Sequence, residues 1–223
     1  MKKILYIYIV LYSSFCFSQN IFLTEAKEIH ANNDKFLYAL TEEPKTDAQY
    51  LGKIEVSGFS NDDAAVFSEI YKKAKSIGGN SYYMKPAENI EGNSTFNPHH
   101  YILYIYYKEK QTIPQKENTV YLINPEKEIE VRINNKKIKL PQRSFLQLDL
   151  SQQEITDISV GKFLGSRIKL QAKNNQPEQY FQISGKKISA NSPASPGINY
   201  KTGDIIALEK SFAQFLLTIY EKF

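Results

Sequence analysis

The pattern of apolar residues changes across one polar segment, and this change limits the fold more than any other feature of the sequence. Residues 111–118 include Pro114, show no hydrophobic periodicity and are mostly polar, as linkers are. Before the segment, strand-like stretches flank one helical stretch, whereas after it short strand-like stretches recur. A chain of 223 residues can hold two small domains. We therefore expect one domain over 19–110, a linker over 111–118 and a second domain over 119–223.

The first 18 residues have the pattern of a secretory signal peptide. Two lysines follow the first methionine, and an apolar run over 4–17 comes next. Cys16 and Ser18 place small residues three and one positions before Gln19, as signal peptidase requires. The run of about 14 residues is shorter than the roughly 20 that span a bilayer. We therefore expect cleavage before Gln19, export to the periplasm, the outer envelope or the medium, and no transmembrane span. The alternative is an uncleaved N-terminal anchor.

Composition excludes several function classes once this leader is set aside. The leader carries two lysines and no acidic residue, so the net charge of +4 falls to +2 without it. Lysines and acidic residues are interspersed in the rest of the chain, which argues against a nucleic-acid partner. The single cysteine, Cys16, also lies in the leader, so disulfides, thiolate catalysis and cysteine zinc sites are excluded from the mature chain. Core packing must stabilise the mature chain, and aromatic residues, of which the whole chain has 13 Phe and 16 Tyr, provide area for that packing.

The first domain is expected to combine strands with one helix. Ser60 and Asp63 form a capping box, the following apolar residues have helical spacing, and Gly78 with Gly79 ends the helix. Strands are expected over 35–40, 50–59, 81–84 and 100–108. The last of these is apolar on both faces, which predicts a central strand of a sheet.

Several residues around this helix match a known family pattern. The stretch Leu51-Gly52-Lys53-Ile54, then Ala74 and Lys75 near the helix end, and then Gly78-Gly79-Asn80 resemble the β-α-β core of YbjQ-type heavy-metal-binding domains and the related RcsF-like envelope domains. Those families share a Leu-Gly-x-Val/Ile strand and an Ala-Lys-x-x-Gly-Ala-Asn helix end. The resemblance covers about 35–108. This chain has Gly79 where alanine is usual and lacks the RcsF-like cysteines, so the metal-binding label does not transfer residue by residue.

The second domain is expected to be an antiparallel β-sandwich closed by a C-terminal helix. Short strands are expected over 119–123, 129–133, 137–140, 145–150, 155–160, 167–172 and 180–183. Asn134 and Asn135 predict a hairpin turn, because asparagine tolerates positive φ. The stretches Val120-Tyr121-Leu122, Val131–Asn135 and Gln179-Tyr180-Phe181 resemble PEGA-type exported sandwich domains. The helix is expected to place five apolar residues on one face: Phe212, Phe215, Leu216, Ile219 and Tyr220. The expected fold class is thus α+β, a small β-α-β domain followed by this sandwich.

Histidines are the candidate metal ligands. His99 and His100 are adjacent, and His30 is distant in sequence. Neighbours on a strand point to opposite faces, and zinc sites need three or four converging ligands. We therefore expect no metal and no cofactor, with these three histidines as the candidates if one is bound.

No catalytic or cofactor-binding motif is present, since the sequence has no Gly-x-Ser-x-Gly, P-loop or Gly-x-Gly-x-x-Gly pattern. Asp62 and Asp63 are better explained by a helix N-terminus. The most unusual feature is the tyrosine-rich strand. Its members Tyr101, Tyr104, Tyr106 and Tyr107 form either core or an aromatic surface for a sugar, a peptide or a partner subunit.

These patterns favour an exported, non-enzymatic envelope protein that acts as a binding or assembly module. Its partner is expected to be a protein or an envelope polymer, and assembly into a homo-oligomer is a further alternative. Two alternatives remain. An envelope-polymer hydrolase would bring His99, His100 and carboxylates together in one cleft. A metal-responsive envelope sensor follows only from the name of the resembled family.

Overall fold

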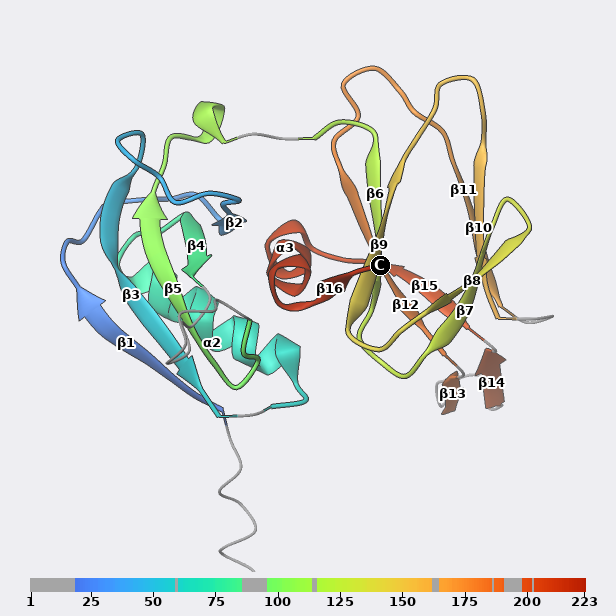
Figure 1. Cartoon of the computed structure of the whole chain (residues 1–223), viewed down its shortest axis with the longest axis horizontal. Helices are drawn as coiled ribbons and strands as arrows, with labels where there is room; N and C mark the ends of the chain where they lie inside the picture. The colour runs from blue at the N-terminus through green and yellow to red at the C-terminus, as the bar shows by residue number, and fades with distance from the viewer. Residues whose placement is uncertain are drawn as a thin grey trace, which may run out of the picture. The chain divides into compact units, whose positions relative to one another are not determined.

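The computed structural model describes residues 19–58, 60–85, 96–113, 116–161, 165–185, 187–190, 198–201 and 203–223. The predicted signal peptide lies outside the described residues. The chain divides between Ile113 and Pro114 into two compact units, which we call the first unit and the second unit (Figure 1). The described elements are mostly strands with two α-helices, as expected for the α+β class. No helix in the described ranges is long and apolar enough to cross a membrane.

The first unit is a five-stranded sheet in the order β1-β3-β5-β4-β2. Its strands are β1 (Asn20–Ala26), β2 (Tyr38–Ala39), β3 (Gln49–Ser57), β4 (Ser81–Lys85) and β5 (His100–Tyr107). The predicted central position of the tyrosine-rich strand β5 is confirmed. All neighbours pair antiparallel except β2 and β4, which are parallel. Strand β1 was not predicted.

The strand expected over 35–40 is wrong in length, since β2 spans only Tyr38–Ala39. The N–H of Phe36 donates to the Asp34 carboxylate (3.0 Å) and so takes no part in a strand ladder. This local hydrogen bond competes with sheet formation, as side chains of aspartate commonly do.

Helix α2 (Asp63–Ser76) lies over one face of this sheet (Figure 1). The expected cap at Ser60 is wrong by two residues. Asp62 is the N-cap, and its Oδ1 accepts the N–H of Ala65 (2.9 Å). The buried residues of the helix are Val66, Phe67, Ile70 and Ala74. Gly78, with φ of +80°, then turns the chain in a conformation that residues with a side chain rarely adopt.

The core of the first unit follows the alternation of its strands. Ile54 and Val56 of β3 and Leu103 and Ile105 of β5 are fully buried and alternate with more exposed neighbours. In a strand, such residues share one face of the sheet. Gly79, in the segment that follows α2, lies against Ile105, and an added Cβ there would be 2.3 Å from Cγ2 of Ile105.

The second unit contains two larger sheets and a two-stranded ribbon. One sheet has the order β11-β10-β7-β8, and the other has the order β15-β12-β6-β9-β16. The strands are β6 (Thr119–Asn124), β7 (Ile129–Ile133), β8 (Lys136–Leu140), β9 (Ser144–Asp149), β10 (Thr156–Val160), β11 (Ser166–Leu170), β12 (Gln179–Ser184), β15 (Asp204–Ala207) and β16 (Glu221–Lys222), with β13 (Lys187–Ala190) and β14 (Ile198–Lys201) forming the ribbon. The predicted hairpin turn is confirmed, with φ of 49° at Asn134 and 67° at Asn135.

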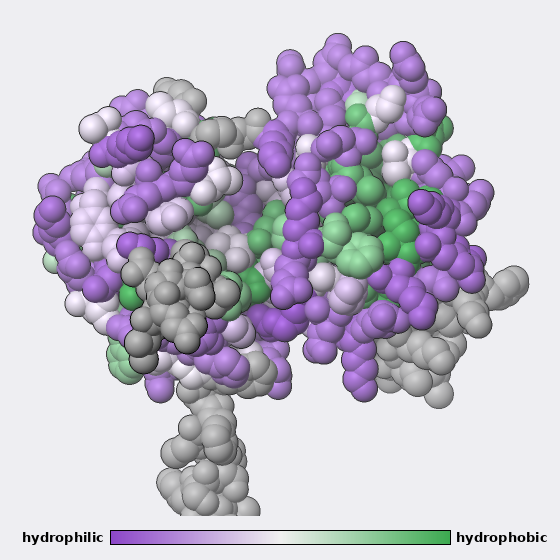
Figure 2. Space-filling view, in the orientation of Figure 1, coloured by the Kyte–Doolittle hydropathy of each residue, from purple (hydrophilic) through white to green (hydrophobic). Residues whose placement is uncertain are grey.

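Both larger sheets contribute to one hydrophobic cluster. It includes Val120 and Leu122 of β6 from one sheet, and Val131 of β7 and Ile158 of β10 from the other. Figure 2 shows apolar side chains gathered on the visible face of the second unit. The expectation that all strands pair antiparallel is wrong. Strand β12 pairs parallel to β6, and β16 pairs parallel to β9.

The predicted C-terminal helix is confirmed as α3 (Lys210–Ile219). Glu209 caps it by accepting the N–H groups of Ser211 and Phe212, each at 2.9 Å. Phe215 and Leu216 are buried, and Gln214 donates to the hydroxyl of Tyr180 on β12 (3.2 Å). A short 3₁₀ helix, η1 (Lys110–Thr112), follows β5 and ends the first unit.

Candidate functional site

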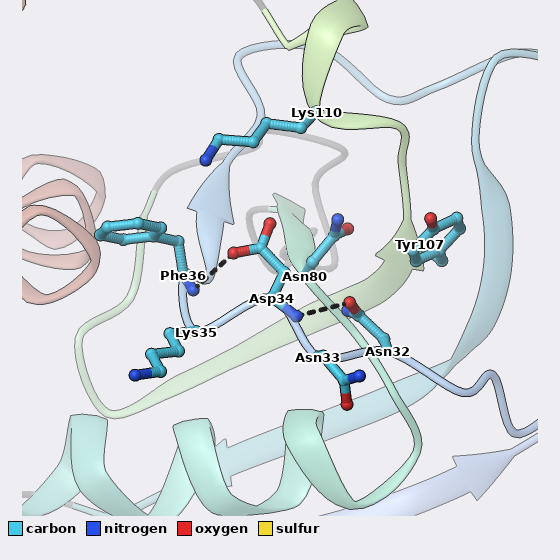
Figure 3. Close-up of a pocket in the computed structure, with 8 residues that line it drawn as sticks. All are labelled: Asn32, Asn33, Asp34, Lys35, Phe36, Asn80, Tyr107 and Lys110. Carbon is cyan, nitrogen blue, oxygen red and sulfur yellow. Dashed lines mark hydrogen bonds between the residues drawn. The ribbon is translucent and has the colours of Figure 1, made fainter.

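A hollow of about 500 Å³ opens in the first unit, beside the C-terminal end of β5 (Figure 3). Four segments contribute to its wall: the loop before β2, the residue directly before β4, the last residue of β5, and η1. The lining residues are Asn32, Asn33, Asp34, Lys35, Phe36, Asn80, Tyr107 and Lys110. Sites that bind small ligands commonly have volumes in this range.

The loop on one side of the hollow is fixed by its own asparagine and aspartate side chains. Oδ1 of Asn32 accepts the N–H of Asp34 (2.8 Å), and Oδ1 of Asp34 accepts the N–H of Phe36 (3.0 Å; Figure 3). Such contacts two residues apart are Asx turns. The amide of Asn32 also donates to the carbonyl of Gly78 (3.0 Å), which ties the loop to the end of α2.

Lys75 fixes the same loop from the helix side. Its Nζ donates to the carbonyls of Asp34 (2.7 Å), Phe36 (2.6 Å) and Gly79 (3.0 Å). Burial lowers the pKa of this lysine, and the nearby Asp34 carboxylate partly opposes that change. Three carbonyl partners use the three N–H donors of an ammonium group, so Lys75 supports the loop and has no donor left for a ligand.

The side chain of Asn80, which also lines the hollow, is held by two hydrogen bonds. Its side-chain amide donates to the carbonyl of Lys108 (2.7 Å), and its side-chain oxygen accepts the N–H of the same residue (2.9 Å). The buried ammonium of Lys108 is paired with Asp47, and this hydrogen bond lowers the pKa of the Asp47 carboxyl. The wall is therefore held by internal contacts and needs no ligand to form.

Other lining groups remain available to a ligand. Asn33, Lys35 and Lys110 are exposed. Within the part of the chain that the structure describes, no hydrogen bond or ion pair engages the side chains of Asn33 and Lys35. Lys110 extends over Phe36, with Nζ 5.6 Å from the ring centroid (Figure 3). Tyr107 is half-buried, and its ring stacks on His30 with centroids 3.8 Å apart. The hollow thus offers ammonium, amide, carboxylate and aromatic groups together.

The structure does not bring the candidate histidines together. His30 stacks on Tyr107 at the end of β5, whereas His100 begins that strand, about 23 Å away at the usual rise per residue. Nε2 of His100 lies 2.7 Å from Oε1 of Glu55, and His99 lies in the turn before the strand. Among the described residues, no three His, Cys, Asp or Glu side chains group closely enough to hold a metal ion. Glu88 and Glu91, two carboxylates that precede the histidine pair in the sequence, lie outside those residues.

The four tyrosines proposed as one binding surface do not form one. Tyr101 and Tyr106 are buried, with 2% and 5% of their surface exposed. Because side chains alternate along a strand, Tyr101 and Tyr107 lie on one face of β5 and Tyr104 and Tyr106 on the other. Only Tyr107 lines the hollow. The aromatic-surface hypothesis is therefore wrong for the set, and the core explanation holds for the two buried members.

Sequence reasoning missed most of the lining residues. The segment Asn32-Asn33-Asp34 carried one signal, since three consecutive residues of this kind favour Asx turns and loops. Asn80 was marked only by its place in the resembled family pattern and Lys110 by no pattern, and the two lie 30 residues apart and meet only through the fold. Comparisons of the chain with protein-family models, with curated proteins and with solved structures found no match.

Proposed function

We propose that this protein is an exported, non-enzymatic binding or assembly module of the cell envelope, and that the hollow in the first unit is its binding site. One observation carries the proposal. The wall of the hollow is fixed by hydrogen bonds that Asn32, Asp34 and Lys75 make within the loop and that Asn80 makes with Lys108, while exposed polar groups such as Lys110 remain available. A preformed site of this kind binds without the cost of ordering its loop.

Export is supported by where the first strand begins. Cleavage before Gln19 would leave β1 complete, since that strand starts at Asn20 and pairs with β3. The leader therefore contributes no residue to the described sheet. N-terminal sequencing of the protein from the cell envelope tests this point, and a mature form that keeps Met1 would contradict it.

The domain assignments are part of the same proposal. For the first unit, a YbjQ- or RcsF-like β-α-β domain is supported by Lys75, Gly78, Gly79 and Asn80, each of which makes a contact specific to its residue type. For the second unit, a PEGA-like β-sandwich is supported by the hydrophobic cluster shared by its two sheets. The parallel pairing of β6 with β12 is a departure that such a sandwich must accommodate.

A binding role is favoured over the hydrolase because the candidate acid and base groups are dispersed. His100 has one carboxylate partner, Glu55, on a strand pair, and His30 lies at the other end of β5. A hydrolase that used one of these histidines as its base would need a nucleophile and an orienting group within hydrogen-bond reach of that histidine. The sensor alternative rests on the same histidines and gains no geometric support from them.

Co-sedimentation with insoluble polymer prepared from the native envelope tests the binding function. The mature protein, residues 19–223, is expected to sediment with the polymer. Lys110→Glu should abolish this, because it replaces an available cation at the hollow by an anion. Lys45→Glu, the same charge change at an exposed lysine that does not line the hollow, should sediment like the wild type. A wild-type protein that stays in the supernatant, or a Lys110→Glu variant that still sediments, would refute the proposal.

A further inference from the structure

We infer that the hollow takes a carboxylated saccharide, whose acid group binds the ammonium of Lys110 and one of whose hydroxyl groups binds Asp34. This inference rests on the proposed binding function and specifies the ligand for that same site. Some polar groups at the hollow are already engaged in hydrogen bonds within the fold, and the groups that remain available determine which ligand fits.

The available charge at the hollow favours an anion. Lys35 and Lys110 lie on its wall, whereas Asp34 is its one lining carboxylate. Lys75 is committed to three carbonyl groups and Lys108 to Asp47, so neither competes for this role. Lys110 sits over the Phe36 ring, which leaves its ammonium accessible on the other side. A carboxylate there would form a charge-assisted hydrogen bond, which is stronger than a neutral one.

Asp34 makes the hollow selective for a ligand that also carries hydroxyl groups. Its Oδ1 accepts the N–H of Phe36, so Oδ2 is the oxygen that remains to accept a hydrogen bond. Figure 3 shows this carboxylate between Phe36 and Asn80, on the side toward Lys110. A phosphate dianion would be repelled by Asp34. A sugar acid with one carboxylate on each ring satisfies both groups, because a carboxylate meets the lysine and a hydroxyl of the same ring donates to the aspartate.

The remaining lining groups suit a sugar ring. Tyr107 is held by its stacking on His30, so its hydroxyl and ring edge are presented in a fixed orientation. A hollow of about 500 Å³ accommodates a short saccharide. A uronic acid unit combines all three features: one carboxylate, several hydroxyls and a compact ring.

Calorimetric titration of the mature protein with digalacturonate tests the inference, with its dimethyl ester as a neutral ligand of nearly the same shape. Digalacturonate should bind at least ten times more tightly than the ester at low salt. Lys110→Gln should reduce digalacturonate affinity about tenfold and leave ester affinity nearly unchanged. Lys45→Gln removes the same charge from an exposed residue that does not line the hollow, so it should change neither affinity. Thermal melts establish that each variant is folded.

Two results would overturn the inference. In the first, the ester binds as tightly as the acid, or neither binds at millimolar concentration. In the second, inorganic phosphate displaces digalacturonate at lower concentration than galacturonate does, which would make the site a phosphate site. Either result leaves the proposed function standing if Lys110→Glu still abolishes co-sedimentation with envelope polymer. Conversely, tight uronate binding without co-sedimentation would refute the envelope role and retain the ligand chemistry.

Discussion

Lys75 shows how one side chain can determine where a distant loop lies. Its ammonium group reaches from the last turn of α2 to the carbonyls of Asp34 and Phe36, 41 and 39 residues earlier in the chain. Hydrogen bonds from a charged donor contribute more to stability than neutral ones. The loop they hold forms one wall of the hollow, so a residue that cannot touch the ligand still determines the shape of the site.

Lys75→Met should therefore lower the free energy of unfolding by about 2 kcal/mol, because three partly buried carbonyl groups would lose their donor while the aliphatic chain is kept. Urea denaturation of the mature protein measures this. Lys72→Met, on the same helix, removes only an exposed pair with Glu69 and should change stability by less than about 0.5 kcal/mol. Equal effects of the two substitutions would show that the three carbonyl contacts contribute nothing.

Sequence reasoning predicted where Lys75 lies but not what it binds. The resembled family pattern places a lysine near the helix end, and the structure places Lys75 in the last turn of α2, where the helix dipole favours a cation. Its carbonyl partners could not be predicted, since backbone groups carry no mark in the sequence and the loop reaches the helix only after the sheet has formed. The same limit applies to the hollow, whose lining residues come from four separate segments.

Tyr106 provides a test at alkaline pH. Its pKa is raised from 10.0 to about 12, first by burial and then by the negative charge of Glu43. Above pH 10 the unfolded chain releases this proton while the folded chain keeps it, so the unfolded state binds fewer protons and stability falls as pH rises toward 12. Tyr106→Phe should flatten this fall in urea-denaturation series from pH 9.5 to 11.5. An unchanged slope would show that Tyr106 titrates like an exposed tyrosine.

At the scale of elements, the end of α2 is the most constrained part of the first unit. Gly78 needs positive φ, and at Gly79 a side chain would meet Cγ2 of Ile105 at 2.3 Å. Alanine is usual at this second position in the family that the segment resembles. A domain with alanine there needs more room on the neighbouring strand, which here is filled by Ile105 of β5.

Gly79→Ala should thus destabilise the protein by about 1–3 kcal/mol through overpacking. In the double variant with Ile105→Ala, the added methyl group would enter the space that the isoleucine leaves. The combined loss should therefore be smaller than the sum of the two single losses by at least about 0.5 kcal/mol, which a double-mutant cycle by urea denaturation measures. Strict additivity would mean that the two positions are not in steric conflict.

Strand existence was predicted better than strand direction. Alternation of apolar and polar residues shows that one face of a strand is buried, and this located most strands of the second unit. Alternation contains no information about which strand lies alongside or in which direction it runs. Between β6 and β12 the chain forms β7 and β8 of the other sheet, β9 beside β6, and then β10 and β11 of the other sheet, before it returns parallel to β6. A hairpin-by-hairpin interpretation could not predict that return.

At the scale of the whole molecule, the question is whether the two units fold independently. The chain divides between Ile113 and Pro114, inside the polar segment that the sequence singled out. Each unit has its own buried residues, with Ile54 and Leu103 in the first and Leu122 and Ile158 in the second. Separate cores of this kind are the property that lets domains fold alone.

Limited proteolysis of the mature protein should therefore cut first within or beside 111–118. Lys110 and Lys116 are exposed there and are sites for trypsin, whereas Lys108 is buried and paired with Asp47. Low trypsin should yield two protected fragments that end near these lysines, identified by intact mass. Replacing both lysines by glutamine should slow this cut, while cuts elsewhere keep their rates.

Each unit expressed alone, as residues 19–113 and 114–223, should also unfold cooperatively in urea. A susceptible linker and independent cores are both consequences of the same division of the chain. If the chain resists cleavage in this window and neither unit folds alone, the two units must instead form one cooperative structure.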